Sequence, residues 1–138
     1  MVAGGYFEGW IGLTEVELFL PHSGTTKICS FMSLPIARIG ATLDTIDSKA
    51  VLCGGYITPI PTDHYNTTCI LFNDGKWSDY AKLMFRRQNH NSWVSGAGLV
   101  IMGGEKGTDS VLGGNSTEIV PSGGGQSVQG FNLKYGTE

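Results

Sequence analysis

The chain has 138 residues, 41% of them hydrophobic and 15% charged, with 21 glycines and a formal net charge of −3. This length fits one ordinary domain, and the apolar share is large enough for a buried core, which excludes a disordered tail. The slightly acidic balance argues against a nucleic-acid partner, and no apolar run reaches the 18 residues of a membrane span.

In chain order, the first predicted strand is an apolar run that ends in two glycines, and no signal peptide is visible before it. The same run occurs three times along the chain, ending at Gly4-Gly5, Gly54-Gly55 and Gly103-Gly104. A second pattern, an alternating strand, follows each pair after a loop and begins at Thr14, Thr67 and Ser116. Two motifs that share a period of about 50 residues indicate an internal repeat.

Each repeat is predicted to hold about four short strands. Segments 40–45 and 91–94 are strand-like and are followed by turn residues, so each forms a hairpin with the strand that ends in Gly-Gly. The glycines fit a strand that turns sharply where another backbone lies close. The best helical candidate, 79–84, is short. The chain is therefore predicted to be a single all-β domain over 1–138, with units of about 1–37, 38–86 and 87–138.

These motifs carry a resemblance to a known repeat. Arg87-Gln88-Asn89-His90 precedes a strand and Gly103-Gly104, and Gly54-Gly55 is followed by a strand at 67–72 and by Trp77. This order resembles the kelch repeat, and segments 29–35 and 130–135 are similar to a divergent, invertebrate-like kelch-type group. Three positions depart from the pattern: Ala41 replaces the His, the first Trp position falls near Cys29, and the third unit has no Trp.

The resemblance implies an incomplete β-propeller of about two and a half to three four-stranded kelch-type blades. The expected structural motif residues are Gly4, Gly5, Gly54, Gly55, Gly103, Gly104, Trp77, Arg87 and His90. Closed propellers have about four to eight blades, so we expect this chain to be a fragment that needs further blades or self-association to close. The number of blades in the full-length protein, and whether the chain is a natural product or a truncated transcript, stay open.

The sequence shows no catalytic constellation. His22, His64 and His90 lack metal-site spacing, and the glycine-rich string 122–127 is not followed by Lys-Thr or by a helix. We therefore expect no catalytic residue, no metal, no cofactor and no enzymatic activity. Two alternatives stay open for a kelch-type propeller. The chain can be part of a galactose-oxidase-like copper oxidase whose ligands lie in missing blades, or it can be a carbohydrate-binding propeller.

The cysteines and the glycosylation sequons are informative about the cellular location of the protein. Cys53 and Cys69 can form a disulfide if their strands make a hairpin, Cys29 can pair with Cys53 instead, or all three are free thiols. The sequons at Asn66 and Asn115 both precede the alternating strand, which predicts N-glycosylation and an extracellular or secreted protein. The alternative is that Asn suits the junction of loop and strand in a cytoplasmic protein.

The remaining prediction is a binding surface. Loops 6–13, 56–65 and 105–115, with 35–38 and 85–89, are expected to line one face of a kelch-type propeller. They are rich in aromatic and Arg residues, which dominate the energetics of protein interfaces. The expected contact residues are Trp10, Tyr56, His64, Tyr65, Arg86 and Arg87. The chain is thus predicted to be a protein-interaction scaffold whose partner is an unidentified protein, with a glycan as a further possibility.

Overall fold

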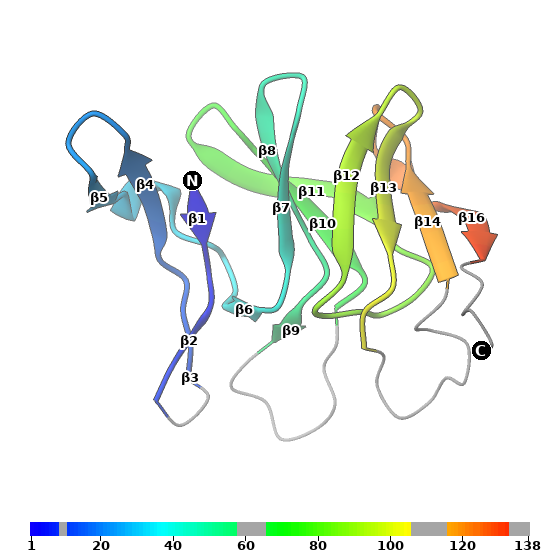
Figure 1. Ribbon diagram of the computed structural model, residues 1–138, viewed down its shortest axis with the longest axis horizontal. Helices are drawn as coiled ribbons and strands as arrows, with labels where there is room; N and C mark the ends of the chain where they lie inside the picture. Colours follow the sequence, from blue (N-terminus) through cyan, green and yellow to red (C-terminus); the bar gives the residue numbers. More distant parts are fainter. Residues whose placement is uncertain (9–10, 58–65, 106–115, 133–138) are drawn as a thin grey trace.

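The computed structural model describes residues 1–8, 11–57, 66–105 and 116–132 (Figure 1). Among these residues every regular element is a β-strand, apart from one 3₁₀ turn, η1, at Ser30–Met32. The all-β class predicted from the sequence is therefore confirmed. The helical candidate 79–84 instead supplies the last residues of strand β11 (Lys76–Lys82).

The described strands form three larger sheets, none of which closes on itself. Sheet 1 contains β1 (Val2–Ala3), β4 (Val16–Leu20) and β5 (Thr25–Ile28), in that order and antiparallel. Sheet 2 contains β7 (Thr42–Ile46), β8 (Lys49–Cys53), β10 (Thr68–Asn73) and β11, again antiparallel. A short segment from further along the chain, β15 (Gly125–Gln126), adds to β11 in parallel.

Sheet 3 and two small strand pairs complete the described structure. Sheet 3 contains β12 (Asn91–Ser95), β13 (Gly98–Met102), β14 (Ser116–Val120) and β16 (Val128–Asn132). The small pairs are β2 (Tyr6–Phe7) with β3 (Ile11–Gly12), and β6 (Arg38–Ile39) with β9 (Tyr56–Ile57). Figure 1 shows both small pairs at the same end of the three sheets, at the bottom of the view.

The strand register shows that the three sheets repeat one arrangement. The residue just before each glycine pair lies opposite an equivalent position on the next strand: Ala3 opposite Val16, Cys53 opposite Cys69, and Met102 opposite Thr117. The sequence alignment of the third strand was wrong by one residue, because it matched Glu118 rather than Thr117 to Val16 and Cys69. The loop before that strand is one residue shorter in the third unit than in the second, which alternation alone does not reveal.

Two cores hold the sheets face to face. The first joins sheets 1 and 2 and is built from Val16, Cys29, Met32, Leu34, Leu52 and Ile70. The second joins sheets 2 and 3 and is built from Ile46, Val51, Cys53, Cys69, Ala81, Leu83, Leu99, Ile101 and Val120. Successive side chains of a strand point to opposite faces, so Leu52 enters the first core and its neighbours Val51 and Cys53 the second. Sheet 2 is thus the middle layer and has both faces covered (Figure 1).

Candidate functional site

The first glycine of each pair adds one backbone hydrogen bond within its own sheet. Its backbone N–H donates to the residue that precedes the position opposite: Gly4 to Glu15 O at 3.0 Å, Gly54 to Thr68 O at 3.1 Å, and Gly103 to Ser116 O at 3.2 Å. All three glycines have φ between +66° and +74°, a conformation that a residue with a Cβ rarely adopts. The repeated glycine therefore follows from backbone geometry.

The second glycine of a pair connects one sheet to the segment that enters the next. Gly5 N donates to Arg38 O at 3.0 Å, and Gly55 N donates to Arg87 O at 2.9 Å. The same carbonyls crowd the first glycines, since a Cβ built on Gly4 or Gly54 would lie 2.6 Å from Arg38 O or Arg87 O. Side chains are excluded here because two backbones meet.

The side chains of the same two arginines attach the segments that precede sheets 2 and 3 to those sheets. Arg38 is 4% exposed, and its Nη1 donates to Gly54 O at 3.0 Å and to Thr68 O at 2.8 Å. Its Nη2 donates to the Thr68 hydroxyl at 2.8 Å. We call this set of bonds, from a guanidinium to the first glycine and to the residue before the opposite position, the arginine clasp.

Sheet 3 repeats the arginine clasp with Arg87, which is fully buried. Its Nη1 donates to Gly103 O at 2.7 Å and to Ser116 O at 3.2 Å, and its Nη2 donates to the Ser116 hydroxyl at 3.0 Å. A side chain in this position has no surface to offer a partner. The expectation that Arg87 contacts a binding protein is therefore wrong, whereas Arg86 beside it is exposed.

The two clasps differ in charge compensation. Arg87 forms a salt bridge of 2.7 Å with Glu118, and both side chains are fully buried. Glu118 lies opposite Ile101 in sheet 3, and the equivalent residue of sheet 2 is Ile70, which lies opposite Leu52. Arg38 therefore has no carboxylate at the position where Arg87 has Glu118. Burial lowers the pKa of Arg38 to about 10, with the charge of Asp79 acting the other way. The Arg38 Nε is buried without a hydrogen-bond partner.

Glu118 also organises the segment between sheets 2 and 3. Its carboxylate accepts hydrogen bonds from Met84 N at 2.6 Å, Phe85 N at 3.3 Å and the Ser127 hydroxyl at 2.6 Å. Pro35, three residues before Arg38, stands where Met84 stands before Arg87, and proline has no N–H to donate. Sequence reasoning missed Glu118, because a single acidic residue on a strand gives no sign of which buried donors it meets.

His90 lies between the middle and third sheets. Its Nε2 shares a hydrogen bond of 2.9 Å with the Thr42 hydroxyl, and its Nδ1 is buried without a partner. Burial, and secondly the charge of Arg87, lower the pKa of His90 to about 4, so the ring is neutral at pH 7. The ring fills the space beside Gly54, where an added Cβ would lie 2.7 Å from its Cε1.

Trp77 links the outer strand of sheet 2 to the end of sheet 1. Its Nε1 donates to Met32 O at 2.7 Å, and its ring packs against Phe72 at a centroid distance of 5.2 Å. Trp77 lies opposite Phe72, and Thr26 lies opposite Phe19 in sheet 1. The equivalent position in the first unit is therefore Thr26, and the expectation that it falls near Cys29 is corrected.

The cysteines adopt one of the arrangements that the sequence left open. Cys53 and Cys69 lie directly opposite each other on β8 and β10 and are joined by a disulfide. Both are fully buried in the core between sheets 2 and 3. Cys29 is a buried free thiol in the other core.

Asn66 has an internal partner. The side chain is 9% exposed, and its Oδ1 accepts hydrogen bonds from the backbone N–H and the hydroxyl of Thr68 at 2.8 and 2.9 Å. Such hydrogen bonds are typical of an Asn at the junction between a loop and a strand. The two sequons also do not share one register position, because Asn66 is two residues before Thr68 and Asn115 is one before the equivalent Ser116.

The expected contact residues are distributed unevenly. Tyr56 is half-buried in β9, whereas the expected contact residues Trp10, His64 and Tyr65, and the sequon residue Asn115, lie outside the described residues. At the same end of the sheets, Tyr6, Phe7 and Ile11 of the β2–β3 hairpin are 56%, 62% and 62% exposed. Figure 1 shows this hairpin projecting beyond the sheets.

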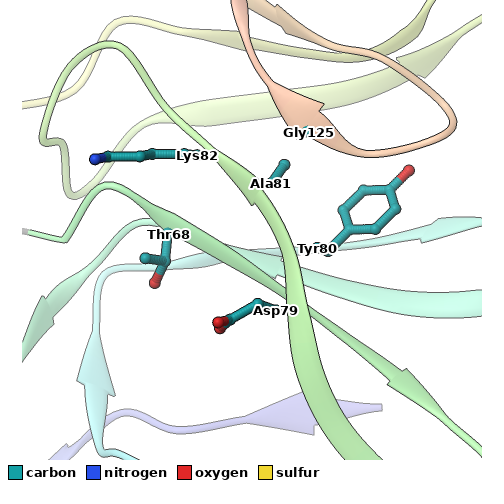
Figure 2. Close-up of a pocket in the computed structure, with 6 residues that line it drawn as sticks. All are labelled: Thr68, Asp79, Tyr80, Ala81, Lys82 and Gly125. Carbon is teal, nitrogen blue, oxygen red and sulfur yellow. The ribbon is translucent and has the colours of Figure 1, made fainter.

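One open cavity of 310 Å³ lies along β11. It is lined by Thr68, Asp79, Tyr80, Ala81, Lys82 and Gly125 (Figure 2). Figure 2 shows the side chains of Thr68 and Asp79 on one side of β11 and the ring of Tyr80 on the other. The Tyr80 hydroxyl donates to Pro121 O at 3.2 Å, so it holds the loop that carries Gly125. Burial, with the charge of Asp47, raises the pKa of Tyr80.

Comparisons with known proteins give no family assignment: no protein-family model matches the chain, and no curated protein matches it significantly. Within the described ranges, no three His, Cys, Asp or Glu residues are grouped as a metal ion would require. The described part of the chain also contains no helix with the length and apolar character to span a membrane.

Proposed function

We propose that the chain is part of a kelch-type β-propeller and acts as a non-enzymatic scaffold that binds a partner protein through the loops at one end of its sheets. The support for the propeller is the repeated connection between sheets. Two successive sheets are joined to the next segment by the same glycine-to-arginine hydrogen bond, and each entering segment is fastened by an arginine clasp. One connection used twice supports a constant relation between successive sheets, which blades require.

The uncovered faces support further blades or self-association. Sheet 1 turns Val2, Phe19 and Ile28 away from the first core, and each is more than half exposed. On sheet 3 the outer row includes Trp93 and Val128, which are 38% and 54% exposed. Apolar sheet faces of this kind are normally covered in a stable protein. The proposal is that like sheets cover them in the complete assembly.

The observation that carries the binding function is the projecting β2–β3 hairpin. Tyr6, Phe7 and Ile11 expose more than half of their surface on one short hairpin, and none of them belongs to either core. Aromatic and large apolar side chains on a scaffolded loop are the usual anchors of protein interfaces. Arg86, exposed in the segment that precedes β12, adds a charged contact in the same class of loop.

The test compares capture of partner proteins by the chain and by a hairpin variant. Tyr6→Ser, Phe7→Ser and Ile11→Ser together should abolish capture of the proteins that the unchanged chain retains, without changing its thermal midpoint. Phe31→Ser is the matched control, because Phe31 is 71% exposed on η1, outside the hairpin. Capture of the same proteins by the hairpin variant would refute the binding surface.

We also propose an extracellular or secreted location. The Cys53–Cys69 disulfide supports it, since structural disulfides persist in oxidising compartments. Because Asn66 is buried and bonded internally, a glycan is expected on Asn115 only. Treatment of natively expressed protein with a glycan-removing enzyme should lower its mass by one glycan, and Asn115→Gln should abolish the change while Asn66→Gln keeps it. No mass change in the unchanged protein would remove this support.

A further inference from the structure

The arginine clasp of sheet 3 contains one oxygen that gathers three hydrogen-bond donors. Glu118 Oε1 accepts from Arg87 Nη2 at 2.7 Å, from Arg87 Nε at 3.1 Å and from Phe85 N at 3.3 Å. Hydrogen bonds between a guanidinium and a carboxylate are stronger than those between neutral groups. These three donors, two on a side chain and one on the backbone, therefore form a binding place for one carboxylate oxygen.

The same three donors recur before sheet 2. Arg38 has the place of Arg87, and Ile36, two residues before Arg38, has the place of Phe85. Arg38 Nε is buried without a hydrogen-bond partner. Among the described residues, Arg38 Nη2 donates only to the Thr68 hydroxyl, and the Ile36 N–H has no acceptor. The donors of sheet 3 are thus repeated in sheet 2 without the oxygen that they bind in sheet 3.

The residue at the place of Glu118 explains why sheet 2 lacks this oxygen. Ile70 stands there, and an isoleucine side chain has no hydrogen-bond acceptor. Arg38 is 4% exposed, and no described residue forms a salt bridge with it. A buried guanidinium without a close counter-charge costs free energy, since it has left water without an equivalent partner. The clasp of sheet 2 is therefore one anion short of the clasp of sheet 3.

The open cavity along β11 adjoins the clasp of sheet 2. Thr68 lines this cavity, and its hydroxyl is 2.8 Å from Arg38 Nη2. Asp79 and Lys82 line the same cavity, and Lys82 lies opposite Thr68, which places the two side chains on one face of the sheet (Figure 2). The charges of Asp79 and Lys82 offset each other. The positive charge of Arg38 then favours an anion as the ligand.

The class of the ligand follows from the donors and from the size of the cavity. A carboxylate is the group that the equivalent donors bind in sheet 3, and 310 Å³ lies at the lower end of the range of about 300–1,000 Å³ for ligand pockets. We propose that Arg38 and Ile36, reached from the cavity beside Thr68, bind the carboxylate of a small molecule. One of its oxygens accepts from Arg38 Nε, Arg38 Nη2 and Ile36 N. This site is separate from the loop surface of the proposed function and does not depend on it.

The experiment titrates the isotopically labelled full chain with sodium acetate and follows the arginine Nε–H and backbone amide signals by nuclear magnetic resonance. The signals of Arg38 Nε–H and Ile36 N–H should shift together and saturate, with a dissociation constant on the order of 1 mM. The Arg87 Nε–H is the internal control and should not move, because Glu118 already occupies it. Sodium chloride at equal ionic strength controls for screening, and acetamide is the neutral molecule of the same shape.

Two variants at one position separate this site from nonspecific attraction. Ile70→Glu supplies the carboxylate that sheet 3 has at the equivalent position, so acetate should no longer shift the Arg38 Nε–H signal. Ile70→Leu, the matched control, should keep the acetate response. An Arg38 Nε–H signal that acetate leaves unmoved, as expected if only water meets these donors, would overturn the proposal without any variant. Equal shifts with acetate and acetamide, or an undiminished response in folded Ile70→Glu, would also overturn it.

Discussion

The buried pair of Glu118 and Arg87 gives the sharpest stability prediction. Glu118→Gln keeps the size of the side chain but removes its charge, which leaves the Arg87 guanidinium fully buried without a counter-charge. Gln also carries an NH₂ group that faces donors, since the carboxylate accepts from Met84 N and from the Ser127 hydroxyl at 2.6 Å each. Both effects act in the same direction.

The expected cost is about 3–5 kcal/mol, the range for removal of one partner from a buried ion pair. Domains of this size are stable by about 5–15 kcal/mol, so the variant should lose a large share of its stability. With a urea dependence of roughly 2 kcal/mol per M, the unfolding midpoint should fall by about 2 M. The matched control is Glu17→Gln, which changes the equivalent position of sheet 1 where no arginine is paired, and it should cost less than about 0.5 kcal/mol.

Equilibrium urea unfolding, followed by Trp fluorescence, measures all three proteins. A double-mutant cycle with Arg87→Met should show that the two single costs do not add, because either change alone breaks the same pair. A loss for Glu118→Gln no larger than that for Glu17→Gln would refute the reasoning that this buried pair fastens the entry into sheet 3.

Three further predictions concern sheet 2 and its contacts. The pKa of the His90 ring is about 4 in the folded chain and near 6.5 in the unfolded chain, so between these pH values only the unfolded chain binds a proton on His90. The free energy of unfolding should therefore fall by up to about 3 kcal/mol as the pH drops from 6.5 to 4. His90→Gln should flatten that part of the pH profile of unfolding, His22→Gln should not, and an unchanged profile in His90→Gln would contradict the assignment. Gly54→Ala should cost about 2 kcal/mol more than Gly75→Ala, since both have positive φ but only the first meets other atoms within 4 Å; equal unfolding midpoints would count against a close approach. Thiol titration of the unfolded, unreduced chain should find one thiol and three after reduction, and reduction should lower stability by about 3 kcal/mol; three thiols before reduction would exclude the disulfide.

Sequence reasoning succeeded where backbone geometry dictates the residue. The glycine pairs could be found because a positive φ and a contacting carbonyl exclude every side chain, so the residue type itself records the structure. The spacing from Arg38 to Arg87 follows the same period, since both guanidiniums bond to main-chain carbonyls that recur with the sheets. Repeated backbone contacts leave a repeated sequence.

The same reasoning could not predict which side chains contact each other. The sequence contains no sign that Glu118 lies beside Arg87, because the two are 31 residues apart and the equivalent of Glu118 in sheet 2 is Ile70. Arg87 was expected both as a structural motif residue and as a contact residue beside Arg86, and its full burial is compatible only with the first of these roles. Loop shortening by one residue, which shifted the alignment of β14, changes no residue type that could reveal it.

The central claim is that one hydrogen bond, from the second glycine of a pair to a clasp arginine, joins each sheet to the next. Nuclear magnetic resonance detects such bonds directly as scalar couplings across them. Couplings are expected from Gly5 N to the Arg38 carbonyl carbon and from Gly55 N to the Arg87 carbonyl carbon, with slow exchange of both amides. If both couplings are absent and both amides exchange as fast as exposed ones, the sheets are not joined as described here.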